Sequence, residues 1–307
     1  MSNKQNISVI IPTKNRPDDL ARLLASLNSQ TLLPNELIIV DASDNDETAN
    51  LIHSVNRANK YSVYYLKTKP SLTHQRNLGI RKSSGNCVFF FDDDIVLNSS
   101  FIEIILKTFK EFNKANVGGI CGRITNVKLN NSKIDRIFKR LFFLTEPGNG
   151  RMKLSGFPAH KCDYDLAFVN VLPGGCTAFS SEVFSTYSFD ENLKGYSYME
   201  DVDFSYRVSK EFNLIYQPDA KLEHFATTYK ATNSRALRRM MVRNHVYLFR
   251  KNLPKGLIHI FAFVMSLIGL LLYNAVLAKD IKACVGIAEG LITPLSLSHS
   301  VKKERDS

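Results

Sequence analysis

Short apolar runs alternate with segments of helical periodicity along the first part of the chain. The apolar runs are rich in β-branched and aromatic residues and predict buried strands at 7–11, 36–40, 62–66 and 86–91. The amphipathic segments predict helices at 17–30, 48–59, 73–82 and 99–114, with Thr73 as the cap of the third. Such alternation is typical of an α/β fold, in which helices cover both faces of a mostly parallel sheet.

Beyond this region the hydrophobic pattern is less regular. Between Gly118 and Val171 it predicts only short strands and loops, and Pro173–Gly175 predicts a tight turn. A short helix is expected at Ser180–Ser185, a longer one from Glu200 to Phe212, and a last strand at Leu214–Tyr216.

Carboxylates follow two of the predicted strands, where parallel sheets bind their ligands. Asp41 ends the second strand, and Asp92, Asp93 and Asp94 directly follow the apolar run CVFFF. Two like charges ~6 Å apart at an effective dielectric near 20 repel by roughly 3 kcal/mol, so such a group persists in water or beside a cation. A solvated turn is one interpretation. A site for Mg²⁺ or Mn²⁺, which take hard oxygen ligands, is the interpretation that we favour.

A second acidic group lies at the start of the predicted helix at 200–212. Asp203 is expected to pair with Arg207, four residues further along the same helix. Glu200 and Asp201 have two interpretations: they interact with the helix dipole in the first turn, or they face a cleft in which one acts as a general base.

Composition and charge limit the remaining classes. The 307 residues are globular in composition, and five cysteines without C-x-x-C spacing argue against a disulfide framework and for a reducing compartment. The N-terminus lacks a signal-peptide core, so we expect the sheet domain to be cytoplasmic. The net charge of +11 is concentrated in residues 230–307, which carry 13 Lys/Arg against 4 Asp/Glu.

Six motifs follow one another in order over residues 1–230. They are VIIPTKNRP, IIVDASDN, LTHQRNLGI, FFFDDD, PGGCTAFSSEVF and MEDVDFSYRV. In this order and spacing the chain resembles an inverting, family-two glycosyltransferase with a GT-A fold. The resemblance implies a Rossmann-like, mostly parallel sheet in residues 1–230 and a helical, membrane-associating tail in residues 231–307.

The resemblance also implies roles for residues that match the motifs. For donor binding, it assigns Thr13 and Asp41 to the edge of the nucleobase pocket, Arg76 and Asn77 to the base or diphosphate, and Asp92 to the ribose. Pro12 and Asp93 are assigned to the same donor site, and Gly174 and Gly175 would let the backbone approach the donor sugar or the acceptor. The sequence reads VDASDN where many relatives read VDDGS, so the nucleobase stays open among UDP-, GDP- and dTDP-linked donors.

For catalysis, the resemblance assigns Asp201 as the base, with Glu200 beside it. Asp94 would hold Mn²⁺ or Mg²⁺ together with Asp92, and His224 resembles a downstream histidine that reaches the metal or diphosphate in some relatives. A metal at Asp94 would neutralise the leaving diphosphate. Asp201 would remove the proton of an acceptor hydroxyl that attacks the opposite face of the sugar.

The tail combines basic and apolar residues. Gly256–Ala278 is an uncharged run of 23 residues, long enough to span ~30 Å of hydrocarbon, with basic residues on both sides. It predicts a spanning helix, a re-entrant hairpin with Cys284–Leu297, a helix lying in the membrane interface, or a helix docked on the enzyme or on a dimer partner. We favour membrane association, because the basic residues suit anionic headgroups. Nucleic-acid binding has no supporting motif.

The expected function is therefore metal-dependent transfer of a sugar to a glycan or lipid-linked glycan, in surface polysaccharide biosynthesis, at the cytoplasmic face of the membrane. The alternative is a catalytically silent nucleotide- or glycan-binding membrane protein that keeps the fold. A nucleotidyltransferase would need a glycine-rich loop near the first strand, and VIIPTKNRP has no glycine.

Overall fold

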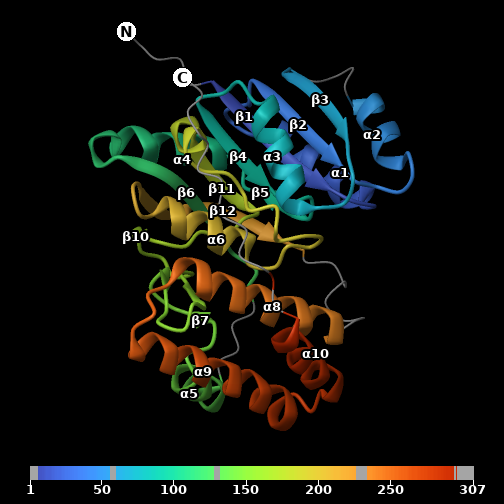
Figure 1. Ribbon diagram of the computed structural model, residues 1–307. Coiled ribbons are helices and arrows are strands. Elements are labelled where there is room, and N and C mark those ends of the chain that lie inside the picture. Colours follow the sequence, from blue (N-terminus) through green and yellow to red (C-terminus); the bar gives the residue numbers. More distant parts are fainter. Residues whose placement is uncertain (1–5, 56–59, 128–131, 226–233, 294, 296–307) are drawn as a thin grey trace, which may run out of the picture.

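The computed structural model describes residues 6–55, 60–127, 132–225, 234–293 and 295. A large twisted sheet with its helices forms one part of the molecule, and helices from the C-terminal part of the chain pack beneath it together with α5 (Figure 1). The predicted domain boundary at 230/231 lies outside the described residues.

The central sheet has the strand order β10-β12-β6-β11-β4-β1-β2-β3, and β5 pairs with β12. Its strands are β1 (Ile7–Thr13), β2 (Glu36–Asp41), β3 (Ser62–Lys67), β4 (Cys87–Phe91), β5 (Ile95–Leu97), β6 (Val117–Ile124), β10 (Ala167–Val169), β11 (Cys176–Ser180) and β12 (Asn213–His224). The helices of this part are α1 (Pro17–Asn28), α2 (Glu47–Val55), α3 (Leu72–Lys82), α4 (Phe101–Glu111) and α6 (Glu200–Val208), with 3-10 turns at Asn113–Ala115 and Ser181–Ser185.

The sheet is mostly parallel, as the sequence pattern predicts. β1 pairs in parallel with both β2 and β4, and all residues of these three strands are buried. β11 runs antiparallel to β4 and β6 and so inserts a reversed strand into the centre. The register places Thr13 opposite Asp41, so the carboxyl ends of β1 and β2 lie level with each other.

The smaller elements lie beside and below this sheet. A second sheet contains β7 (Glu146–Pro147), β9 (Pro158–His160) and β8 (Arg151–Met152), and the remaining helices are α5 (Lys133–Leu141), α8 (Ser234–Asn252), α9 (Leu257–Leu272) and α10 (Ile281–Ile292). A π-helical turn, Tyr273–Leu277, extends α9.

Three expectations need correction. The region 118–171 contains the helix α5 in addition to strands and loops. The last strand is much longer than Leu214–Tyr216, because β12 continues past a register shift to pair with β5. Thr73 does not cap α3. The N-cap residue is Ser71, and the Thr73 hydroxyl instead donates to the carbonyl of Leu193.

The C-terminal helices share a hydrophobic core with the sheet part. Val202 of α6 and Phe157, which precedes β9, lie in one apolar cluster with Val242 and Tyr247 of α8. The cluster is bordered by a polar junction in which Lys251 contacts Asp190 at 2.6 Å and the fully buried Asp203 at 3.0 Å. Asp203 also binds Arg207, which confirms the predicted pair.

His245 lies inside this shared core. Its ring stacks on Phe157 with centroids 3.8 Å apart, and Nε2 lies 3.3 Å from the hydroxyl of Ser266 on α9. Burial lowers the pKa of His245 from 6.5 to about 3, so the folded protein holds this ring neutral at pH values where the unfolded chain protonates it.

We expect His245 to make the fold acid-sensitive. Because its folded pKa is depressed, its contribution is complete above pH 6.5 and declines as the pH falls toward about 3. Between about pH 6.5 and 4.5 the loss is about 2 kcal/mol of unfolding free energy. Urea denaturation should show that acidification lowers the unfolding free energy of His245→Gln less than that of wild type. The exposed His53→Gln is the control, and equal pH dependence of all three proteins would contradict the assignment.

Candidate active site

A cavity of about 1030 Å³ opens at the carboxyl ends of β1 and β4. Its walls come from Pro12–Asp19 after β1, from Asp92–Asp94 after β4, from the turn before α6, and from His224 at the end of β12. The site therefore lies where the sequence predicts a ligand in a parallel sheet.

Asp92, Asp94 and His224 come together in this cavity. One ligand atom of each lies within 4.8 Å of the others, and His224 Nε2 is 2.9 Å from Asp94 Oδ1. Burial alone would raise the pKa of Asp94, but the hydrogen bond and charge of His224, together with Arg16, lower it below its ordinary value. Two carboxylates and an imidazole form a donor set that suits Mn²⁺ and also accepts Mg²⁺.

Asp93 points to a different set of partners. It accepts a hydrogen bond from Thr13 Oγ1 at 2.7 Å and one from Arg16 at 3.0 Å. Burial raises the pKa of Asp93 to about 6, although Arg16 and Thr13 oppose the rise. Asp93 therefore joins the end of β1 to the acidic turn after β4.

Arg76 connects the two acidic groups that the sequence separates by more than a hundred residues. Its side chain is only 1% exposed, and its guanidinium donates to Glu200 Oε1 at 2.5 Å and to Asp92 Oδ1 at 3.1 Å. Burial and the neighbouring Asp201 raise the pKa of Glu200 to about 8, while Arg76 opposes this rise. Arg76 thus holds the Glu200 carboxylate beside Asp92.

Asp201 lines the same cavity and is held by backbone groups. Its Oδ2 accepts from the N–H of Gly174 at 2.9 Å, and its Oδ1 accepts from the N–H of Val202 at 2.8 Å. His160 of β9 also lines the cavity, and burial lowers its pKa although the charge of Asp201 opposes this. A carboxylate fixed by two N–H groups at a cavity wall has the position that a general base requires.

These features can be compared with known proteins. The family model "Glycosyl transferase family 2" matches residues 8–186, which is more than half of the chain. The chain belongs to glycosyl transferase family 2.

Individual relatives match part of this family 2 chain. An uncharacterized glycosyltransferase, YwdF of Bacillus subtilis (strain 168), is 30% identical over 139 residues, or 45% of this chain and 50% of the relative. A GalNAc(5)-diNAcBac-PP-undecaprenol β-1,3-glucosyltransferase of Campylobacter jejuni is 29% identical over 117 residues, or 38% of each chain. The matches thus span half or less of these relatives.

A solved structure agrees over a longer stretch. The mannosyltransferase PcManGT of Pyrobaculum calidifontis, solved with GDP-Man and Mn²⁺, superposes with a TM-score of 0.58 at 13% identity. The likeness covers 95% of this chain and 87% of that one. The family 2 chain has the GT-A fold.

Several site residues that the resemblance assigned lie at the cavity. They are Pro12, Thr13, Arg76, Asp92, Asp93, Asp94, Gly174, Glu200, Asp201 and His224. The lining does not include Asp41, which is fully buried beneath it and bonded to Ser43, Tyr65 and Lys67. Asn77 also points away, because its amide binds Phe189 and Glu191. Neither Asp41 nor Asn77 lines the cavity, and their expected contacts with the nucleotide stay predictions.

Gly175 does not line the cavity, and its expected role in letting the backbone approach the donor sugar or the acceptor stays a prediction. A Cβ on Gly175 would lie 2.1 Å from Asp92 Oδ2, so the glycine provides space for Asp92 beside Asp94 and His224. The neighbouring Gly174 contributes its N–H to Asp201.

Sequence reasoning missed Arg16, His160 and Tyr198, all of which line the cavity. Arg16 belongs to the motif VIIPTKNRP, which also contains Pro12 and Thr13, so its place in this motif could have identified it as a site residue. His160 falls in the region between Gly118 and Val171, where no periodic pattern indicated that it would fold toward the acidic groups.

Replacing Gly175 by alanine should weaken cation binding without unfolding the protein. The new methyl group would displace the flexible Asp92 carboxylate from Asp94 and His224, while the buried strands stay in place. Titration calorimetry should show Mn²⁺ affinity at least about tenfold lower, which corresponds to ~1.4 kcal/mol. Gly256→Ala, where the nearest atom is 3.8 Å away, is the matched control. Unchanged Mn²⁺ binding in Gly175→Ala would exclude Asp92 from the cluster.

Proposed function

We propose that this chain transfers a sugar from a nucleotide-sugar donor to a hydroxyl of a glycan or lipid-linked glycan, with inversion and with a divalent cation. The observation that supports it best is the shared cavity: Asp92, Asp94 and His224 lie in the same space as Asp201. A cation site for a diphosphate and a carboxylate for a proton are the two groups that a single displacement requires.

Asp92, Asp94 and His224 would hold Mn²⁺ or Mg²⁺, which when bound neutralises the charge of the departing diphosphate. Arg16 bonds to Asp93 and Asp94 and so fixes the carboxylates from the side of β1. The donor is a UDP-, GDP- or dTDP-linked sugar, and its nucleobase would lie against the end of β1, where the Gln75 amide of α3 donates to the carbonyl of Thr13 at 3.0 Å.

Asp201 is the proposed base, with Glu200 as a positioning residue. The N–H groups of Gly174 and Val202 hold Asp201 toward the cavity, so it can take the proton of an acceptor hydroxyl while that oxygen attacks the anomeric carbon. Attack opposite to the leaving diphosphate inverts the configuration in one step. Glu200 acts through Arg76, which it holds against Asp92.

Asp201→Asn should abolish most transfer while donor binding persists. The amide keeps the size of the side chain but cannot accept a proton, so the rate should fall by about 10²- to 10⁴-fold. Thermal stabilisation by UDP, GDP and dTDP, each with and without Mn²⁺, measures nucleotide binding and identifies the preferred nucleobase. The exposed Asp165→Asn is the matched control. Transfer at the wild-type rate in Asp201→Asn would make the base assignment wrong. Nucleotide binding by a wild-type protein that transfers no sugar would favour the silent-fold alternative.

We further propose that the protein works at the cytoplasmic face of a membrane, in surface polysaccharide biosynthesis. Among the described residues, the helix Leu257–Leu277 is long and apolar enough to span a membrane by length and composition, with a hydropathy of 2.3. One side of α9 carries Ala262, Ser266 and Gly269, which are buried against the protein. The other side exposes large apolar residues, among them Leu257, Ile258, Phe261, Val264, Ile268 and Leu271.

Helix α5 carries a second exposed apolar stripe and lies beside α9. Phe138 of α5 contacts Tyr273 after α9 with ring centroids 5.9 Å apart, so the two helices are neighbours (Figure 1). Ile134, Ile137 and Leu141 are each more than 60% exposed and lie along one stripe of α5. Exposed Lys133, Arg136 and Arg140 border this stripe, and Lys279 and Lys282 follow α9.

We call the exposed apolar residues of α5 and α9 the membrane surface, and we propose that this surface binds an anionic bilayer. Its apolar residues would enter the acyl boundary and its basic residues would meet the headgroups. Because one side of α9 packs against the protein, a crossing helix would draw the charged α5 and α8 into hydrocarbon, at a cost of several kcal/mol. Of the arrangements that the sequence allows, we therefore propose a helix that lies in the plane of the membrane interface.

Ile137→Asp combined with Ile134→Asp should release the protein from vesicles. Each exposed apolar side chain that enters the acyl boundary contributes roughly 1.5–3 kcal/mol, so the double change should lower partitioning by well over tenfold. Co-sedimentation with phosphatidylcholine vesicles, with and without phosphatidylglycerol, measures this. Leu32→Asp, at an exposed apolar position after α1, is the control. If the double variant bound vesicles like wild type but changed from dimer to monomer, a second copy of the chain would be the occupant instead.

A further inference from the structure

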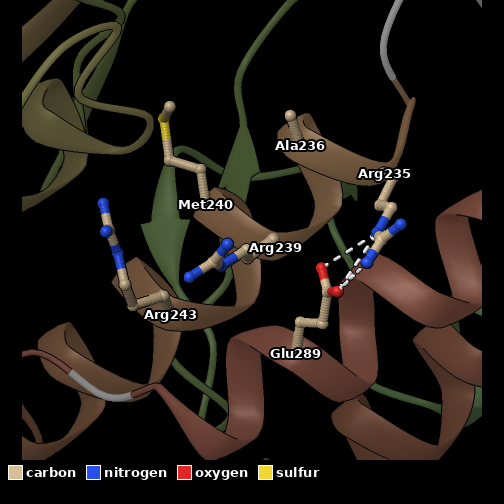
Figure 2. A pocket seen from close by; sticks show the side chains of 6 residues that line it. All are labelled: Arg235, Ala236, Arg239, Met240, Arg243 and Glu289. Carbon is tan, nitrogen blue, oxygen red and sulfur yellow. Dashed lines mark hydrogen bonds and ion pairs between the residues drawn. The ribbon is translucent and has the colours of Figure 1, made fainter.

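A basic pocket lies outside the active site, between α8 and α10. Arg235, Arg239 and Arg243 follow one another at four-residue intervals on α8 and line a cavity of about 490 Å³, with Glu289 of α10 on its border (Figure 2). We call these three arginines and their cavity the arginine pocket. It shares no lining residue with the active-site cavity.

The charges in the arginine pocket are not balanced. Arg235 holds Glu289, with its Nε 3.1 Å from each carboxylate oxygen, so this acidic group is already engaged (Figure 2). Within the described part of the chain, no carboxylate lies within ion-pair distance of Arg239 or Arg243. Among the described residues, two guanidinium groups of the pocket therefore have no carboxylate partner.

Arg243 carries direct signs of an unmet interaction. Its Nε is buried and has no hydrogen-bond partner among the described residues. Burial, and then the charge of Arg239, lower the pKa of Arg243. A buried donor without an acceptor is destabilising, and a bound anion would offset both this loss and the repulsion between the two arginines.

The backbone beneath the arginine pocket is closely packed. A Cβ on Gly286 would lie 2.2 Å from the carbonyl oxygen of Arg235, and one on Gly290 would lie 2.7 Å from that of Arg239. These glycines let α10 pack directly against α8. Asp280 caps α10 through the N–H of Ala283 and also bonds to Ser234 at the start of α8. The helix that carries the arginines is thus held in one position.

We propose that the arginine pocket binds a phosphate group. A guanidinium presents paired N–H groups that match two oxygens of a phosphate, and two of them at four-residue spacing suit a multiply charged phosphate better than a single carboxylate. The volume accommodates a phosphate or diphosphate together with part of the group that carries it.

Helix α8, which carries the arginine pocket, also contacts a residue of the active-site wall. Burial raises the pKa of Tyr198, which lines the active-site cavity, and the charge of Arg238, the neighbour of Arg239, opposes this rise. Asn244, the neighbour of Arg243, donates to the carbonyl of Tyr198 at 2.8 Å. If the proposed transferase function holds, the phosphate belongs to the acceptor or to a lipid headgroup beside it, and these two sources have the same phosphate chemistry.

Titration calorimetry of the full chain with inorganic pyrophosphate tests the proposal. EDTA and the absence of nucleotide keep the divalent-cation cluster from contributing. Arg239→Gln combined with Arg243→Gln should weaken pyrophosphate binding at least about tenfold. Lys107→Gln combined with Lys110→Gln removes the same charge from an exposed face of α4 and should change it by less than about twofold.

A charge-preserving variant separates a built site from a general positive field. We call the protein with Arg239→Gln and Arg243→Gln the glutamine variant. Arg239→Lys combined with Arg243→Lys keeps both charges but loses the paired N–H groups, so its affinity should fall between those of wild type and the glutamine variant. Equal pyrophosphate affinity in wild type and in the folded glutamine variant would overturn the proposal. So would the absence of pyrophosphate binding by folded wild-type protein.

Vesicles identify the source of the phosphate. If the glutamine variant binds phosphatidylcholine vesicles containing phosphatidic acid less well than wild type does, the pocket takes a lipid phosphate. If only pyrophosphate binding falls, it takes the phosphate of a soluble ligand. These assays contain neither donor nor acceptor. A chain that binds pyrophosphate through these arginines but transfers no sugar would therefore refute the proposed function alone.

Discussion

The arrangement of the active site depends on one buried guanidinium. Arg76 lies between Asp92 and Glu200, and Asp201 is close enough to influence it. Carboxylates this close repel one another by a few kcal/mol at an effective dielectric near 20. Because Arg76 is almost fully buried, its positive charge is weakly screened, and it holds the acidic turn after β4 against the start of α6.

The fold brings this arginine and its partners together from distant parts of the chain. α3 carries Arg76, the end of β4 supplies Asp92, and the first turn of α6 supplies Glu200. α6 also packs against α8, since Val202 lies in one apolar cluster with Val242 and Tyr247. The active-site cavity and the C-terminal helices therefore contact the same short helix.

Much of this could be predicted from the sequence, because apolar strands that end in aspartates indicate both the sheet and the edge at which a ligand binds. The grouping of Asp92, Asp94 and His224 agrees with that expectation. The positions of Asp41 and Asn77 could not be predicted, because their partners Tyr65 and Phe189 are found only through tertiary packing. In the same way, His160 lies in a segment whose conformation is set by contacts with other elements and not by its own periodicity.

The junction at Lys251 has a consequence for how the chain can be divided. Asp190 and Asp203 belong to the sheet part, and both contact this one ammonium group of α8. A truncated chain ending before α8 would leave Asp190 without its lysine and would uncover the apolar side of Val202 and Phe157 to solvent. The sheet part and the C-terminal helices therefore share one apolar core, and we expect an isolated sheet domain to be prone to aggregation.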